Sequence, residues 1–142
     1  MPVQTRRIIN IRLQTCRSFW KRCSIATKKR FGVDITTDEV MSVYGSQEAM
    51  AHIGLTLCDP GDLILVPNPG YPMFEMSGIM AHAEIGYYTI EEKNGYLPDL
   101  ESIPEDMLRR ARYMIVSYPL NPVCVCAPDE FYERLIAFAK GK

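Results

Sequence analysis

The sequence predicts an α/β fold, with a sheet of mostly parallel strands and helices on its faces. Two observations lead to this prediction. From residue 39 onward, short runs rich in β-branched residues alternate with stretches whose apolar residues recur at helical spacing, which is the pattern of βαβ units. The connections between these runs contain Pro and Gly, which favour tight turns, as in residues 58–62 (CDPGD).

The first βαβ unit is predicted between residues 39 and 66. Residues 39–44 (EVMSVY) have the composition of a strand, and residues 46–58 carry apolar residues at helical spacing. The Pro-Gly turn that follows leads into a short apolar strand at residues 63–66.

The second half of the chain continues the alternation. After a Pro-rich break, we expect a helix at residues 73–81, a strand at 84–89 and a tight turn at Asn94-Gly95. Pro104 is suited to the first turn of a short helix that ends at residue 110. The remaining predicted elements are a strand at residues 113–118 (YMIVSY) and an amphipathic helix at 129–140.

Composition limits the class of protein. A chain of 142 residues with 47% hydrophobic and 23% charged residues is typical of one globular domain. No apolar run approaches the roughly 18 residues that span a bilayer. The five cysteines show no paired spacing and the two histidines no metal-ligand spacing. We therefore expect a cytoplasmic protein with reduced thiols, no metal site, and no membrane or nucleic-acid partner.

Charge divides the chain into two parts. The first 30 residues hold nine of the 16 Lys and Arg residues and none of the 17 Asp and Glu residues. A transit peptide or a nucleic-acid arm has such a bias, but the segment lacks a clean helical period. An incorrect start site or a shifted reading frame is the third interpretation. We predict a basic segment at residues 1–30 and an incomplete domain at residues 31–142.

Three positions follow predicted strands and carry side chains suited to ligand binding. Gly45, Ser46 and Gln47 begin the helix at residues 46–58, where backbone N–H groups and the helix dipole favour an anion. The simpler alternative is an ordinary strand-to-helix junction with a serine cap. The motif therefore predicts a phosphate cradle only if other residues support it.

The other two positions are Tyr71 and Asn121. Prolines flank both, so each side chain is presented on a stiff loop. Tyr71 can stack on a planar ring, or it can pack as a plug of its own loop. Asn121 can donate a hydrogen bond to a ligand oxygen, or it can simply form an Asn-Pro turn. In a parallel sheet the carboxyl ends of the strands share one edge. Phosphate cradle, aromatic ring and amide together suit a phosphorylated planar heterocycle.

The order and spacing of three phrases identify a family. The phrases are VYGSQEAMAHIGLTLCDPGDLILVPNPGYP, NGYLPDLESIP and YMIVSYPLNP. Over roughly residues 30–140 the chain resembles the class I/II aminotransferases, which are fold type I pyridoxal-phosphate enzymes, and most closely the branch of the LL-diaminopimelate aminotransferases. The resemblance implies the N-terminal part of the large domain of such an enzyme.

The resemblance also implies a cofactor and roles for five residues. The cofactor is pyridoxal 5′-phosphate, with amino-acid and 2-oxo-acid substrates and a homodimer in the full-length form. Ser46 and Gln47 would hold the phosphate, Gly45 would allow close approach, Tyr71 would stack on the ring and Asn121 would bind its phenolic oxygen. Val123-Cys124 stands where the family has Thr-Gly after Asn-Pro.

The catalytic residues of the family fall outside this sequence. Family members carry an Asp, a Tyr, the cofactor-linked Lys and a substrate-binding Arg after the segment that matches. No catalytic residue is therefore assigned, and we expect an aminotransferase fragment that is inactive alone. Two alternatives are a truncated paralogue that acts as an interaction module and a pyridoxal-phosphate lyase of the same fold.

Overall fold

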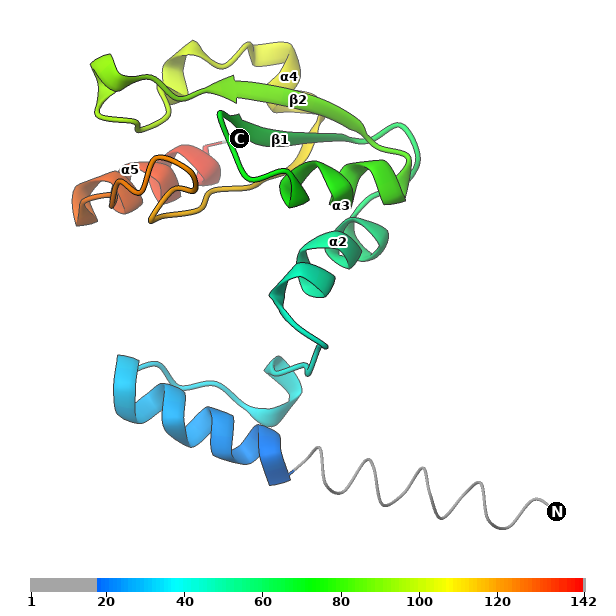
Figure 1. Ribbon diagram of the computed structural model, residues 1–142, viewed down its shortest axis with the longest axis vertical. Coiled ribbons are helices and arrows are strands. Elements are labelled where there is room, and N and C mark those ends of the chain that lie inside the picture. Colours follow the sequence, from blue (N-terminus) through cyan, green and yellow to red (C-terminus); the bar gives the residue numbers. More distant parts are fainter. Residues whose placement is uncertain (1–17, 142) are drawn as a thin grey trace, which may run out of the picture. The chain divides into compact units, whose positions relative to one another are not determined.

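The computed structural model describes residues 18–141, which belong to two compact units that divide between Tyr44 and Gly45. In the first unit a helix covers residues 18–31, and a short 3-10 helix, η1 (Thr37–Glu39), follows (Figure 1). Most of the predicted basic segment, residues 1–17, lies outside the described residues. The predicted boundary after residue 30 stays a prediction.

The strand predicted at residues 39–44 is wrong. Glu39 ends η1, where its carboxylate accepts hydrogen bonds from the backbone N–H and the hydroxyl of Thr36, at 2.8 and 2.9 Å. Residues 40–44 have no strand partner in the described sheet, and Tyr44 is 99% exposed. A β-branched composition favours a strand only where a neighbouring strand and a core receive it, and this segment has neither.

The second unit is built on a three-stranded parallel sheet in the order β2-β1-β3. The strands are β1 (Leu63–Asn68), β2 (Glu84–Thr89) and β3 (Ala111–Met114). β1 lies in the centre and pairs in parallel with β2 along its whole length and with β3 over its first half. The predicted parallel α/β sheet is therefore confirmed.

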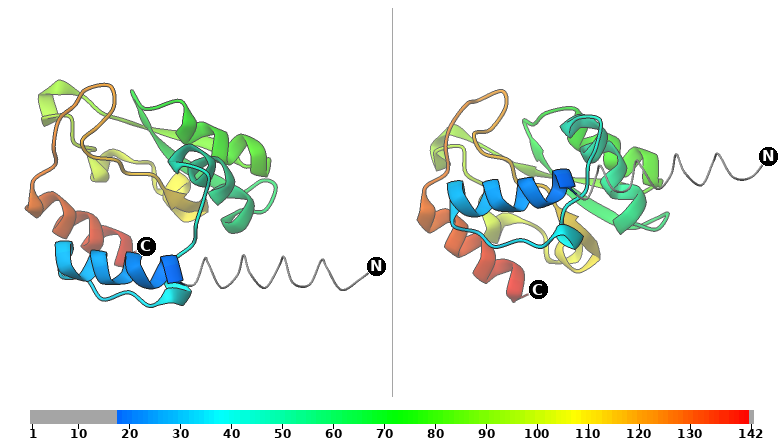
Figure 2. Two further views of the ribbon diagram at one scale, coloured as in Figure 1. Left: turned by 60° about the horizontal axis from the view of Figure 1, so that its bottom comes forward. Right: turned by 90° about the horizontal axis from the view of Figure 1, so that it is seen from below.

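Helices cover both faces of this sheet, as Figures 1 and 2 show. The helices are α2 (Ser46–Leu57), α3 (Met73–Ala81), α4 (Glu105–Arg110) and α5 (Asp129–Lys140). α2 and α3 pack on the face that carries Ile64 and Val66, whereas α4 and α5 pack on the face that carries Leu63 and Leu65. Alternate residues of one buried strand thus supply both cores, as a sheet covered on both faces requires.

Element boundaries agree closely with the prediction where proline or glycine marks the end of an element. The predicted helices at residues 73–81 and 129–140 and the strand at 84–89 are confirmed to the residue. The last strand is predicted at residues 113–118 but lies at residues 111–114, because β3 begins directly at the end of α4. The last backbone hydrogen bond from this segment to β1 is donated by the Ile115 N–H to the Leu65 carbonyl, at 2.9 Å. Within residues 18–141 no helix is long and apolar enough to cross a bilayer.

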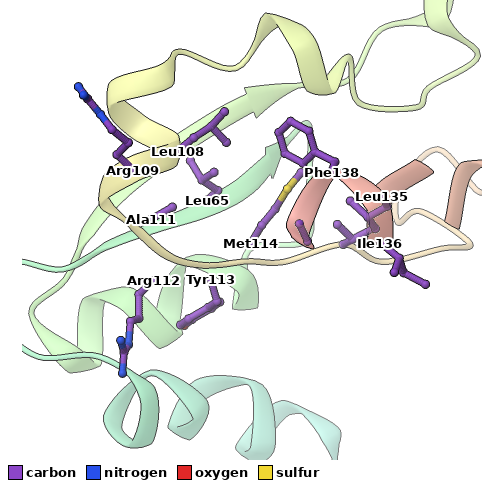
Figure 3. Close-up of a pocket in the computed structure, with 12 residues that line it drawn as sticks. Leu65, Leu108, Arg109, Ala111, Arg112, Tyr113, Met114, Leu135, Ile136 and Phe138 are labelled. Carbon is purple, nitrogen blue, oxygen red and sulfur yellow. The ribbon is translucent and has the colours of Figure 1, made fainter. Parts of the chain in front are cut away.

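A groove of about 600 Å³ runs beside β3, between α4 and α5 (Figure 3). Leu108 and Phe138 close it on the side of α4 and α5, and Met114 projects between them from the strand. In the part of the chain that the structure describes, β3 pairs on one side only.

Two tyrosines fasten loops to the core through their hydroxyls. Tyr88, which is 4% exposed, donates to the Ile115 carbonyl at 2.6 Å, and Tyr118 donates to the Tyr96 carbonyl at 2.7 Å. The Tyr118 ring also meets Phe131 of α5 edge-on, at 5.5 Å between ring centroids. Burial raises the pKa of Tyr118 to about 12, with a smaller contribution from Tyr132, and burial raises the pKa of Tyr88 further.

Helices α2 and α3 approach each other at backbone distance. A Cβ atom at Gly54 would lie 2.0 Å from the Ser77 carbonyl oxygen, and Ser77 is completely buried. Since real Cβ atoms do not approach backbone that closely, only glycine fits at this crossing.

We predict that Gly54→Ala lowers the free energy of unfolding by about 2 kcal/mol. Overpacking of about 3 kcal/mol outweighs the roughly 1 kcal/mol that alanine gains in helix propensity. Urea unfolding followed by circular dichroism measures the difference. Gly141→Ala is the matched control, because its Cβ would meet only ordinary contacts; equal stability of the two variants would contradict the packing.

We predict that the protein loses stability between about pH 10 and pH 12. The unfolded chain releases its phenolic protons near pH 10, whereas folded Tyr118 keeps its proton up to about pH 12. In that window the unfolded state binds fewer protons, so the free energy of unfolding falls as the pH rises.

Urea unfolding at about pH 9 and about pH 11 tests this window. Tyr118→Phe should flatten the fall, while Tyr44→Phe, which changes an exposed ring, should leave it unchanged. A fall of the same size in Tyr118→Phe and in the unsubstituted chain would contradict the assignment.

Candidate functional site

The site begins at the N-terminus of α2. Gly45 is the residue before the helix, with φ 116° and ψ 156°, and no atom lies within 4 Å of the position where a Cβ would stand. Only glycine adopts this backbone region readily. The geometry therefore leaves open space in front of the helix, bounded by a residue that cannot carry a side chain without strain.

The first turn of α2 provides hydrogen-bond donors to that space. Intrahelical bonding starts with the Ala49 N–H, which donates to the Gly45 carbonyl at 3.4 Å, so the N–H groups of Ser46 and Gln47 have no partner inside the helix. Ser46 adds a hydroxyl and is exposed, as is Gln47. With the dipole of a 12-residue helix behind them, these groups suit an anionic oxygen cluster such as a phosphate.

Tyr71 lies on the loop between β1 and α3. A Cβ at Gly70 would stand 2.4 Å from the Pro67 carbonyl oxygen, so the loop turns tightly just before the tyrosine. The half-buried Tyr71 ring meets Phe74 edge-on, with ring centroids 5.9 Å apart and an interplanar angle of 81°. Phe74 itself is 5% exposed and belongs to the core on this face, which gives Tyr71 a firm base.

A hydrogen bond joins these two parts of the site. The Gln47 Nε2 donates to the Tyr71 Oη at 2.6 Å. The structure thus brings the start of α2 and the Tyr71 side chain together, although residues 40–44 before α2 do not form the strand on which the predicted placement of Gly45 relied. The sequence does not predict this side-chain contact, because the two residues stand 24 positions apart.

Asn121 lies on the loop that follows β3. Parallel strands β1 and β3 are neighbours, so Tyr71 and Asn121 follow strands that end at the same edge of the sheet. Asn121 is exposed, and within residues 18–141 its side chain makes no hydrogen bond to Ser46, Gln47 or Tyr71. The preceding residue, Leu120, is 1% exposed and holds the loop to the core.

The Asn121 loop closes on itself through its backbone. The Leu120 N–H donates to the Val125 carbonyl at 3.1 Å, and Cys124 has a φ of 60°. Residues with a Cβ reach this left-handed conformation at a cost of roughly 1 to 2 kcal/mol. Cys124 occupies the position at which the resemblance places Gly, and its backbone has the left-handed conformation that glycine favours.

Metal ligation has no support within the described part of the chain. No group of three or more His, Cys, Asp or Glu side chains is arranged to hold an ion there. The groups that the structure places together are the N–H groups and the Ser46 hydroxyl at the start of α2 and the Gln47–Tyr71 pair.

Known proteins match both the sequence and the fold. The family model "Aminotransferase class I and II" matches residues 19–142. The LL-diaminopimelate aminotransferase of Syntrophobacter fumaroxidans is 44% identical over 114 residues, and that of Halothermothrix orenii is 42% identical over 113. These matches cover 80% and 79% of this chain, which spans 29% of the length of each relative.

Solved structures agree with this result. Substrate-bound BacF from Bacillus subtilis superposes with a TM-score of 0.82 at 35% identity, covering 88% of this chain and 32% of BacF. Alanine aminotransferase from Pyrococcus furiosus gives a TM-score of 0.79 at 29% identity, covering 88% of this chain and 32% of that enzyme. With a parallel α/β sheet, the glycine-led start of α2 and a family match over residues 19–142, the chain belongs to the class I and II aminotransferases.

Proposed function

We propose that this chain supplies the phosphate- and ring-binding part of a pyridoxal 5′-phosphate site in an enzyme that transfers an amino group from an amino acid to a 2-oxo acid. The observation that carries the proposal is the hydrogen bond between Gln47 and Tyr71, which holds an aromatic ring beside the donor-rich start of α2. Family membership supplies the cofactor class.

Each residue of the site has one task in this proposal. The N–H groups of Ser46 and Gln47 and the Ser46 hydroxyl bind the phosphate, and Gly45 leaves room for it. The Tyr71 ring packs against the heterocycle, and the Asn121 amide donates to the oxygen on that ring. The bound cofactor would supply an electron sink for chemistry at the substrate carbon next to the amino group.

The open space at Gly45 supports the fit of a phosphate. Gly45 has a φ of 116°, which a residue with a Cβ adopts only with strain, and beyond its two chain neighbours no described atom lies within 4 Å of the position of such a Cβ. The proposal extends to a homodimeric enzyme in a reducing cytoplasm, where Cys23, Cys58, Cys124 and Cys126, all free, would stay reduced.

We further propose that these 142 residues bind the cofactor without completing a transamination. Of the lysines described in the second unit, Lys93 is paired with Glu91 and Lys140 lies in the last turn of α5. Neither belongs to α2 or to the loop between β1 and α3, which form the candidate site. The covalent step would therefore need a lysine other than these two.

We predict that Ser46→Ala weakens binding of pyridoxal 5′-phosphate about tenfold, because it removes a hydroxyl that bonds a charged oxygen, a contact worth about 1.5 kcal/mol. Titration followed by visible absorbance gives the dissociation constant. The variant should bind pyridoxal, which lacks the phosphate, as the unsubstituted chain does. Ser102→Ala, which removes an exposed hydroxyl on η3 (Leu100–Ser102), is the control. Unchanged binding in Ser46→Ala would refute the phosphate assignment.

We predict no amino transfer by the 142-residue chain with pyridoxal 5′-phosphate and any amino-acid and 2-oxo-acid pair. A coupled assay for the product amino acid measures the rate. Borohydride reduction followed by peptide mapping shows which lysines the cofactor has modified. Turnover together with a single specifically modified lysine would overturn the proposal, whereas scattered modification of exposed lysines without turnover is the expected result.

A further inference from the structure

The Gln47 side chain reaches away from its own helix to a residue on another loop. Its Nε2 donates to the Tyr71 Oη at 2.6 Å, slightly shorter than the roughly 2.7 to 3.2 Å usual for N–H···O bonds. Ordering a long amide side chain at an exposed site costs up to about 1.5 to 2 kcal/mol of rotamer entropy. Such a bond therefore contributes little to stability, which directs attention to what it does to the tyrosine.

A tyrosine ring has two side-chain motions, and the structure restrains each at a different atom. The hydroxyl lies on the axis about which the ring spins, so a bond to the Tyr71 Oη fixes where that axis points but leaves the spin free. The spin is limited by Phe74, whose ring meets Tyr71 at an interplanar angle of 81°. Gln47 and Phe74 together thus define both the direction and the plane of the ring.

The two restraints come from different parts of the unit. Phe74 belongs to α3 and to the core beneath it, whereas Gln47 belongs to the first turn of α2, next to Ser46. The direction of the ring is therefore set by the same helical turn that presents the phosphate donors. A ligand with a phosphate and a flat ring would meet both in a fixed relation.

We infer that the Gln47 side chain is a positioning residue for Tyr71: it orients the aromatic ring before a phosphorylated heterocycle binds, while the Gln47 backbone N–H serves the phosphate. The inference rests on the proposed function and adds a second role to this residue. In this role the phenol oxygen of Tyr71 accepts the hydrogen bond that orients the ring, which a phenylalanine could not do. Ordering the ring in advance reduces the entropy lost on binding.

The test is a double-mutant cycle on Gln47 and Tyr71 in the 142-residue chain. The probe is 4′-deoxypyridoxine 5′-phosphate, which has the ring and the phosphate but no aldehyde, so that lysines do not react with it. Gln47→Met removes the donor and keeps both the backbone N–H and the side-chain length, and Tyr71→Phe removes the acceptor and keeps the ring. Calorimetry or fluorescence titration gives the affinity of each variant and of the double variant.

We predict that each single variant binds the probe about fivefold more weakly, the effect of one neutral hydrogen bond. The double variant should bind no more weakly than either single variant, because both changes remove the same bond. Competition by inorganic phosphate alone should be unchanged in Gln47→Met, since the N–H remains. The induced circular dichroism of the bound probe, which reports how the ring is held, should decrease in both variants, and thermal melting should not.

Thr56→Ala on the exposed far end of α2 and Tyr132→Phe on α5 are the matched controls, and both should bind the probe normally. Additive losses in the double variant, or unchanged affinity in Gln47→Met, would overturn the positioning role. If Ser46→Ala weakens binding of the probe while Gln47→Met does not, the positioning role fails and the proposed function stands. If the unsubstituted chain does not bind the probe, both fail.

Discussion

The whole second unit depends on the burial of β1. Four successive residues, Leu63 to Val66, are at most 4% exposed, and they alternate between the two cores. β1 pairs in parallel with β2 along its length and with β3 over its first half, and because both of its faces are apolar, helices must cover both. Removal of that strand would leave α3, β2 and β3 without a common partner.

The geometry of the candidate site depends on this strand. β1 ends at the loop that carries Tyr71, and Phe74 anchors the following turn in the core. α2 is held at the candidate site by its packing on α3, where Gly54 lies against Ser77. The start of α2 and the Tyr71 ring thus meet because both elements pack on one core.

The sequence predicted most strongly those features that local chemistry decides. The helices at residues 73–81 and 129–140 both follow a proline, and the second carries a clear apolar face; both are confirmed. The strand at 39–44 failed because strand composition has no effect without a partner strand. The Gln47–Tyr71 bond links residues 24 positions apart and depends on how α2 packs on α3, which no local pattern records. Roles for Ser46, Tyr71 and Asn121 toward a cofactor remain predictions.

The close crossing of α2 over α3 makes α2 a lever. Its pivot is Gly54, and Gln47 lies seven residues away, about 10 Å along the helix axis at 1.5 Å per residue. A tilt of about 10° at the pivot would move the Gln47 end by about 2 Å. That displacement exceeds what a hydrogen bond tolerates, so the packing of Gly54, which lies outside the candidate site, sets the position of the Gln47 side chain at Tyr71.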